Sequence, residues 1–192
     1  MADPGRIGAP LLLVLVLITA AFTLQAAQDP KVNPQAKVLQ DFQSRIDKYM
    51  EVHKAAAGEL PKLKETEDPA KIKSVQDALA ARIRAARSNA RQGEIFTPEI
   101  ARHLRGLIYP EVKGRQGAET KQAIKDEQPS SIRLKVNARY PEDEPLPTVP
   151  PNLLASLPKL PEELEYRVVG NDLILRDVPA NLIVDFIPNA IR

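Results

Sequence analysis

Residues 164–187 read LEYRVVGNDLILRDVPANLIVDFI, and this stretch decides the fold class. Leu164–Val169 is rich in strand-forming residues. Gly170-Asn171 fits a two-residue hairpin turn, because glycine adopts positive φ at little cost. The same logic predicts a returning strand, a second turn and a third strand, in the order Leu173–Leu175, Val178-Pro179-Ala180 and Asn181–Ile187. We therefore expect a small antiparallel sheet near the C-terminus.

The first half of the chain has the periodicity of helices instead. Its clearest stripe is spaced alternately by three and four residues: Leu39, Phe42, Ile46, Tyr49, His53, Ala56 and Leu60. Pro61 is expected to end this helix. Asp68-Pro69 and Thr97-Pro98 are start signals for two further helices, because each places an N-cap residue before a proline. Pro110 should stop the third helix, and a weaker fourth is expected over about residues 118–127.

The segment between the two halves combines a strand pattern with abundant proline. From Ile132 to Tyr140, apolar and polar residues alternate, which predicts a half-exposed strand that joins the sheet. Seven prolines fall within residues 141–161, and they indicate an extended, stiff connector. A single helical turn is expected around residues 152–157.

These elements predict an α+β fold, with an N-terminal antiparallel helical hairpin or bundle followed by a small antiparallel β-sheet module. The hairpin follows from the short connection between the first two helices. The expected divisions are a signal peptide or anchor over 1–27, a helical domain over 28–128, a strand over 129–140, a proline-rich connector over 141–161 and a β-module over 162–192.

An unbroken apolar run, Leu11–Phe22, follows Arg6 near the N-terminus. A positive residue, a short apolar core and a small-residue exit are the layout of a Sec-type signal peptide, with cleavage expected after Ala26 or Ala27. The apolar stretch could alternatively serve as an uncleaved anchor in the inner membrane, although it is shorter than the roughly 20 residues that span a bilayer. We expect the protein to lie outside the cytoplasm, in the periplasm or secreted, with membrane contact only if this segment is uncleaved.

Composition narrows the classes of function. The chain has no cysteine, so an exported fold must depend on burial and not on disulfides. Its net charge of +2 implies no particular partner. Aromatic residues make up 4% of the chain and tryptophan is absent, which disfavours sugar-binding and base-stacking surfaces. We therefore expect no nucleic-acid partner.

Catalytic and metal-binding motifs are missing from the sequence. There is no Gly-x-Ser-x-Gly motif, and Gly114-Arg115-Gln116-Gly117 lacks the lysine and hydroxyl residue of a phosphate-binding loop. His53 lies in the apolar stripe of the first helix and is expected to be a partly buried histidine, whereas His103 is expected on the surface beside Arg102 and Arg105. The acidic run 142–144 is interpreted as a solvated loop. We predict no catalytic, cofactor-binding or metal-ligating residues, and hence a protein that is not an enzyme.

One charged cluster stands out. Six arginines fall within 24 residues that contain only Glu94 and Glu99 as acids: Arg82, Arg84, Arg87, Arg91, Arg102 and Arg105. Such a cluster can meet phosphates or carboxylates, so it is a candidate surface for an anionic envelope component or an acidic envelope protein. The alternative is a solvated helix face whose arginines pair with nearby acids.

The C-terminal third resembles a known module. Pro145-Leu146-Pro147, Leu157–Pro161, Tyr166–Leu175, Asp177 and Ile183-Val184-Asp185 follow one another as in small bacterial periplasmic proteins related to the nickel/cobalt-homeostasis protein RcnB. The likeness covers about 45 of 192 residues. It implies a small periplasmic β-module. The metal role of those relatives is not carried over, because histidine-rich and methionine-rich segments are missing.

The predicted function is that of an exported, non-enzymatic periplasmic or envelope protein that binds a protein or an envelope component. The alternative is a periplasmic accessory protein of metal stress or ligand binding, in the manner of the RcnB relatives.

Overall fold

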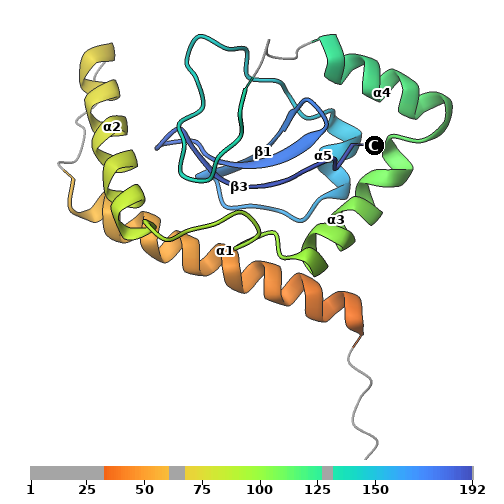
Figure 1. Cartoon of the computed structure of the whole chain (residues 1–192), viewed down its shortest axis with the longest axis horizontal. Helices are drawn as coiled ribbons and strands as arrows, with labels where there is room; N and C mark the ends of the chain where they lie inside the picture. The colour runs from red at the N-terminus through yellow and green to blue at the C-terminus, as the bar shows by residue number, and fades with distance from the viewer. Residues whose placement is uncertain (1–32, 61–67, 127–131, 192) are drawn as a thin grey trace, which may run out of the picture. The chain divides into compact units, whose positions relative to one another are not determined.

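The structure is a computed structural model, and it describes residues 33–60, 68–126 and 132–191. Within these residues the chain has the predicted α+β fold, with an antiparallel sheet and helices that precede it in sequence (Figure 1). The elements are α1 (Pro34–Gly58), α2 (Pro69–Ala86), α3 (Pro98–Glu111), α4 (Gly114–Asp126), α5 (Pro151–Ser156), β1 (Leu164–Val169), β2 (Asp172–Asp177) and β3 (Leu182–Ile187).

α2 and α3 begin at the predicted N-caps. The side chain of Asp68 accepts a hydrogen bond from the backbone N–H of Ala70, and that of Thr97 accepts one from Ile100. Two predicted boundaries differ. α3 continues past Pro110 to Glu111, because a proline in the last turn removes only one helical hydrogen bond. α4 begins at Gly114, earlier than expected. The predicted stop at residue 61 lies outside the described residues.

The sheet has the strand order β1-β2-β3, and both neighbouring pairs are antiparallel. Val169 pairs with Asp172 across the predicted turn. Gly170 has a φ of 61°, which suits the first central position of a type II′ turn and explains why glycine stands there. The sequence thus predicted all three strands and the hairpin between the first two.

β3 contains a bulge that changes which side chains face the helices. Leu175 of β2 pairs with Asp185, but the next residue of β2, Arg176, pairs with Ile183. Val184 is therefore left between two paired residues, and Val184 and Asp185 both point to the helix side of the sheet. A bulge re-aims side chains in this way because two residues of one strand oppose one of the other.

The predicted fourth strand is not formed. The segment 132–140 makes only an isolated bridge, between Arg139 and Leu182. It nevertheless lies along the outer edge of β3, where the N–H of Asn137 donates to Ile183 and the N–H of Ile183 donates to Ala138. Asn137 has a φ of 63°, in the left-handed region, and this turn interrupts the extended backbone that a strand requires.

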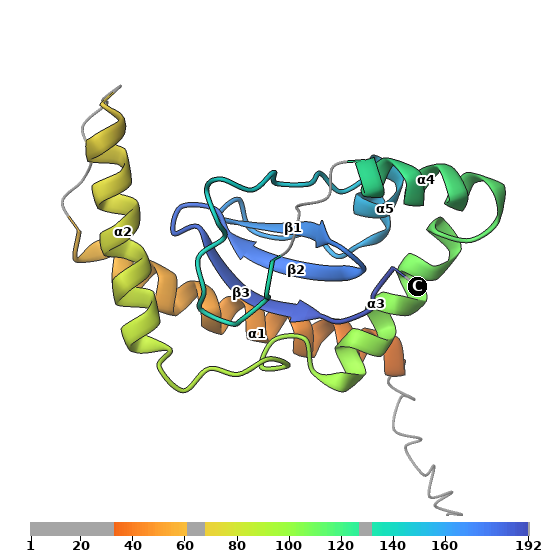
Figure 2. The same ribbon diagram turned by 45° about the horizontal axis from the view of Figure 1, so that its top comes forward.

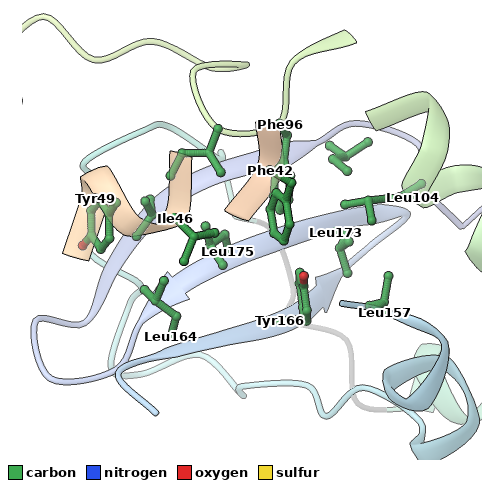
Figure 3. Close-up of a cluster of buried hydrophobic side chains, with 14 of the residues drawn as sticks. Phe42, Ile46, Tyr49, Phe96, Leu104, Leu157, Leu164, Tyr166, Leu173 and Leu175 are labelled. Carbon is green, nitrogen blue, oxygen red and sulfur yellow. The ribbon is translucent and has the colours of Figure 1, made fainter. Parts of the chain in front are cut away.

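The sheet is covered on both faces. Its helix side carries Leu164, Tyr166, Leu173 and Leu175, which pack against Phe42, Ile46 and other buried residues of α1, α3 and α5 (Figure 3). Phe42 and Phe96 stack with their ring centroids 6.0 Å apart.

The opposite side of the sheet carries a second cluster that contains Tyr140, Val169, Ile174 and Ile183, with Ile132, Leu134 and Leu146 packed against it. The 132–147 segment, which we call the arm, therefore forms a third layer.

Helices and sheet belong to one compact unit, Val32–Arg192. The boundaries predicted near residues 128 and 161 thus separate kinds of secondary structure within that unit. Figures 1 and 2 show α1 running beneath the sheet, with α2 at one end and α3, α4 and α5 at the other. α2 contacts α1 but rises away from it in both views, because the arm also packs against α2: Arg139 pairs with Asp77 and Lys73 pairs with Glu142.

Among the helices that the structure describes, none has the length and apolarity needed to cross a lipid bilayer. The apolar run at residues 11–22 lies outside the described residues.

The packing of α1 on the sheet can be tested with two substitutions on the same helix. Phe42 is 1% exposed and Leu39 is 38% exposed. Phe42→Ala should lower the free energy of unfolding by about 3–5 kcal/mol, because it leaves a cavity between α1 and β2. Leu39→Ala should lower it by less than about 1 kcal/mol. Urea denaturation followed by circular dichroism measures both, and equal losses would contradict the assigned face of α1.

Candidate functional site

Among the described residues, four side chains of the histidine, arginine and acidic types are buried: His53, Arg87, Asp177 and Asp185. Buried charges require partners, because their desolvation is otherwise too costly. Their contacts determine whether they are available for chemistry.

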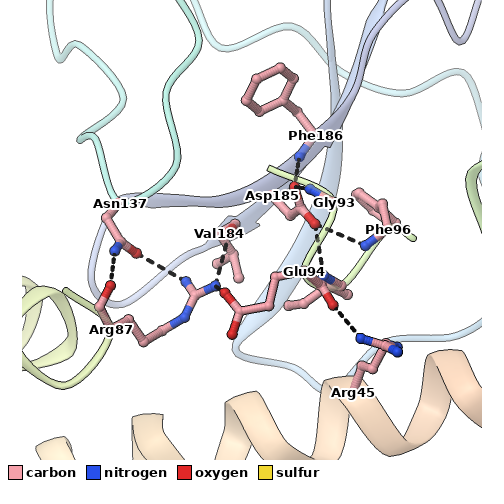
Figure 4. A network of polar contacts seen from close by, with 10 residues as sticks. Arg45, Arg87, Gly93, Glu94, Phe96, Asn137, Val184, Asp185 and Phe186 are labelled. Carbon is pink, nitrogen blue, oxygen red and sulfur yellow. Dashed lines mark hydrogen bonds and ion pairs between the residues drawn. The ribbon is translucent and has the colours of Figure 1, made fainter. Parts of the chain in front are cut away.

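Asp185 fixes the loop between α2 and α3 to β3 (Figure 4). One carboxylate oxygen accepts hydrogen bonds from the backbone N–H groups of Ile95 and Phe96, each at 2.8 Å. The other accepts from Gly93 at 2.9 Å and from Phe186 at 2.8 Å. Four backbone donors satisfy this fully buried carboxylate, so it is a structural anchor that leaves no lone pair for a substrate.

Arg87 joins three parts of the chain at the end of α2. Its guanidinium donates to the side chain of Asn137 at 3.0 Å, to Glu94 at 3.2 Å and to the carbonyl of Val184 at 3.3 Å (Figure 4). The amide of Asn137 in turn donates to the carbonyl of Arg87 at 2.7 Å. The guanidinium also lies 5.0 Å from the ring centroid of Tyr49. This arginine therefore holds the arm and β3 to the helices.

Asp177 connects the end of β2 to α1. One of its oxygens accepts from the hydroxyl of Tyr49 and contacts Nδ1 of His53, both at 2.6 Å, and the other accepts from the N–H of Ala180 at 2.8 Å. The hydrogen bond to Asp177 raises the pKa of His53, although burial opposes the rise. Burial, and secondarily the Asp177 charge, raises the pKa of Tyr49. The tyrosine is thus a neutral hydrogen-bond donor.

A carboxylate beside histidine and tyrosine is also an arrangement that can serve acid–base catalysis. Here His53 is buried. A pocket of about 490 Å³ is lined by Tyr49 and by charged residues of α1 and the α2–α3 loop, and His53 is not among its lining residues. Among the described residues, the side chains of His53 and Asp177 are 6% and 0% exposed, so the group acts as a cross-link between α1 and the sheet.

The six arginines of the predicted patch have different surroundings. Arg82 pairs with Glu59, Arg87 is 7% exposed within the network described above, and Arg105 donates to the carbonyl of Pro188 at 2.8 Å. Arg91 and Arg102 are exposed, and Arg84 is half-buried. The cluster thus contains one structural arginine and residues that lie on different elements.

The structure also describes the surroundings of the other polar residues singled out in the sequence, His103 and the acidic run 142–144. His103 is half-buried on α3. Glu142 of the acidic run pairs with Lys73, and Asp143 is exposed in a turn. In the described part of the chain, no group of three or more histidine and acidic side chains lies close enough together to hold a metal ion.

An open apolar groove lies beside β1, with a volume of about 700 Å³. We call it the β1 groove. It is lined by four consecutive residues, Leu164–Arg167, and by residues of the 148–160 segment. Side chains alternate between the two faces of a strand, so a hollow lined by four consecutive residues runs along the edge of β1 and not beneath one face. Leu154, which is 49% exposed, forms part of its wall.

Two polar atoms of groove-lining residues are buried without a hydrogen-bond partner among the described residues: the hydroxyl of Tyr166 and Nε of Arg167. Only one other side-chain atom in the described part of the chain, Nε of Arg139, shares this condition. Tyr166 is 4% exposed, and burial raises the pKa of its hydroxyl, so the group is neutral there. Native folds satisfy most buried polar atoms, so these two atoms are exceptions, and both belong to residues that line the groove.

Sequence reasoning missed both the anchors and the groove. Asp177 and Asp185 entered the sequence analysis only as positions of the resemblance to periplasmic modules. An aspartate within an otherwise apolar strand is a signal that could have marked them, because such a residue must find donors if it faces the core. The proline-rich 141–161 segment offered no comparable signal for the groove, which depends on where α5 packs.

The sequence matches no protein-family model, and comparisons with curated proteins and with solved structures found no match.

The role of Asp185 predicts a large effect from a small change. Asp185→Asn replaces one carboxylate oxygen by an amide NH₂, which then faces backbone N–H donors and loses their hydrogen bonds. We expect the free energy of unfolding to fall by at least about 2 kcal/mol. Asp172→Asn is the matched control, because Asp172 accepts from Asn189 at an exposed position, and it should cost less than about 1 kcal/mol. Chemical denaturation of both variants measures the difference.

The His53–Asp177 contact predicts a pH dependence of stability. Because the pKa of His53 is raised above 6.5 in the folded protein, its charged form adds stability that is fully present below pH 6.5. This contribution should be lost as the pH rises through the folded pKa of His53. Asp177 keeps its bonds to Tyr49 and Ala180, so the loss should be partial. His53→Gln should remove this part of the pH profile of unfolding, and His103→Gln should leave it unchanged.

Proposed function

We propose that the chain is an exported, non-enzymatic binding protein of the bacterial periplasm or envelope, and that the β1 groove holds its protein partner. The observation that carries this proposal is an apolar hollow on the surface, beside a strand edge, with two unsatisfied buried polar atoms on its lining residues. Apolar hollows of this kind with a few polar groups are the usual form of binding sites.

The state of the buried acids supports binding over catalysis. Asp177 and Asp185 are both occupied by donors from their own fold. The groove has one lining carboxylate, Glu165, and it is paired with Arg167 at 2.6 Å and with Arg176 at 2.5 Å. These arginine bonds lower the pKa of Glu165 although its burial opposes them, so this acid stays ionised and is a poor proton donor.

Export is supported by the apolar run at residues 11–22. The structural anchors described above, buried carboxylates that bind backbone N–H groups, stabilise the fold without disulfides. A partner in the envelope is therefore the natural occupant of the groove. No contact in the described residues favours a metal-stress role over this one.

The proposal predicts crosslinking that is confined to the groove. A photoreactive phenylalanine analogue at position 154, in the full-length chain expressed in bacterial cells, should give a discrete adduct in the periplasmic fraction. The same analogue at position 72 should not, although Ile72 and Leu154 are similarly exposed, at 47% and 49%. Ala155→Arg, which changes an exposed lining residue, should abolish the adduct. Equal crosslinking from both positions, or an adduct that survives Ala155→Arg, would contradict a partner in the groove.

A further inference from the structure

We propose that the β1 groove binds an extended segment of its partner protein, which adds to the outer edge of β1 as a fourth, antiparallel or parallel strand. This inference rests on the proposed function and names the form of the partner. It follows from the two edges of the sheet, from the hydrogen-bond register of β1 and from the charges of the groove.

The outer edges of β3 and β1 differ in how their backbone groups are covered. The arm covers the start of the β3 edge through backbone hydrogen bonds with Asn181 and Ile183. Farther along β3, the side chains of Arg87 and Gln92 donate to the carbonyls of Val184 and Phe186. Along β1, the backbone bonds in the described part of the chain run to β2, apart from a local turn from Leu164 to Pro161. An uncovered strand edge is a template for pairing, and folded proteins usually block it. Here it is bordered by an apolar hollow instead.

The register identifies which groups of β1 are available. Val169 and Asp172 close a two-residue turn, so they form a hydrogen-bonded pair. Alternation along the strand then directs the backbone groups of Glu165, Arg167 and Val169 toward β2. The N–H and C=O groups of Tyr166 and Val168 point the opposite way, toward the open edge. A bound strand would satisfy them, since main-chain bonds supply much of the affinity in strand addition.

The walls of the groove suit a strand with alternating side chains. Val149 and Pro151 line it from the stretch that follows the arm, and Leu154, Leu157 and Leu160 line it from α5 and the residues after it. A strand on β1 would project successive side chains toward the two faces of the sheet. β1 is six residues long, which corresponds to about 20 Å of extended chain. We therefore expect a partner segment of about six residues with apolar residues at alternate positions.

The charges of the groove favour an acidic residue within that segment. Its charged lining residues are Lys159, Glu165 and Arg167, which give a net charge of +1. Lys159 is exposed, and Nε of Arg167 is buried without an acceptor among the described residues. A carboxylate on the partner strand would meet the exposed ammonium group of Lys159.

The test uses the processed protein purified from cells and a nine-residue fluorescein-labelled peptide. Valine alternates with threonine in this peptide, and its central residue is aspartate. Two further versions carry N-methyl groups on the valines or on the other residues. In an added strand, the backbone N–H groups of only one of these two sets of residues face β1. The version methylated on that set should bind at least about tenfold more weakly, equivalent to about 1.4 kcal/mol. The other version should bind like the unmodified peptide.

Three comparisons accompany this measurement. Leu154→Lys should weaken peptide binding at least about tenfold, and Ile72→Lys should leave it unchanged. Replacing the central aspartate of the peptide by lysine should also weaken binding. In amide hydrogen exchange measured by NMR, the unmodified peptide should slow exchange at Tyr166 and Val168, with little change at Glu165 and Arg167, which already bond to β2.

Each remaining outcome overturns strand addition. Equal binding of both methylated peptides would mean docking through side chains alone, and the proposed function would stand. Absence of peptide binding would also overturn strand addition. The proposed function would be contradicted only if the photoreactive analogue at position 154 also gave no adduct. Protection of Tyr166 and Val168 without peptide would identify another occupant. It would be a second copy if sedimentation gives a dimer, or residues 1–32 if protection requires the unprocessed chain.

Discussion

The carboxylate of Asp185 holds the two halves of the chain in their relative positions. It is fully buried, and it accepts four backbone hydrogen bonds, three of them from the loop that connects α2 to α3. That loop decides where α3 begins, and Phe96 at its end stacks on Phe42 of α1. The bulge in β3 makes the contact possible, because without the extra residue Asp185 would point to the opposite face of the sheet.

A second constraint is the size of the sheet. Three short strands with apolar residues on both faces cannot remain in water without cover. α1 covers one face and the arm covers the other, so the sheet lies between two layers that come from earlier parts of the sequence. Two buried side chains connect these layers: Arg87 binds the arm to the helices, and Asp177 binds the sheet to α1. The buried charges are therefore part of the scaffold.

The same arrangement leaves one edge of the sheet open. The arm runs along β3, whereas the chain beyond it turns into α5 and returns to β1 from a distance, which leaves the groove between them. The functional proposals depend on this asymmetry. Groups that look catalytic, such as the buried His–Asp–Tyr contact, are enclosed by the fold, whereas the β1 groove is open to solvent.

The sequence by itself determined the fold class and most of the helices and strands. Caps such as Asp68 and Thr97, the stripe through Phe42 and Ile46, and the Gly170 turn are local signals, and each acts within a few residues. Tertiary structure alone decided what depends on distant neighbours. The segment 132–140 has the alternation of a strand, but the left-handed turn at Asn137, where Arg87 binds, limits it to a single bridge. Likewise, the sequence does not indicate that Arg87 is buried while Arg91 is exposed. Asp185 is an anchor and not a surface acid, because the bulge and the packing of the loop bring it to donors that lie about 90 residues away in the chain.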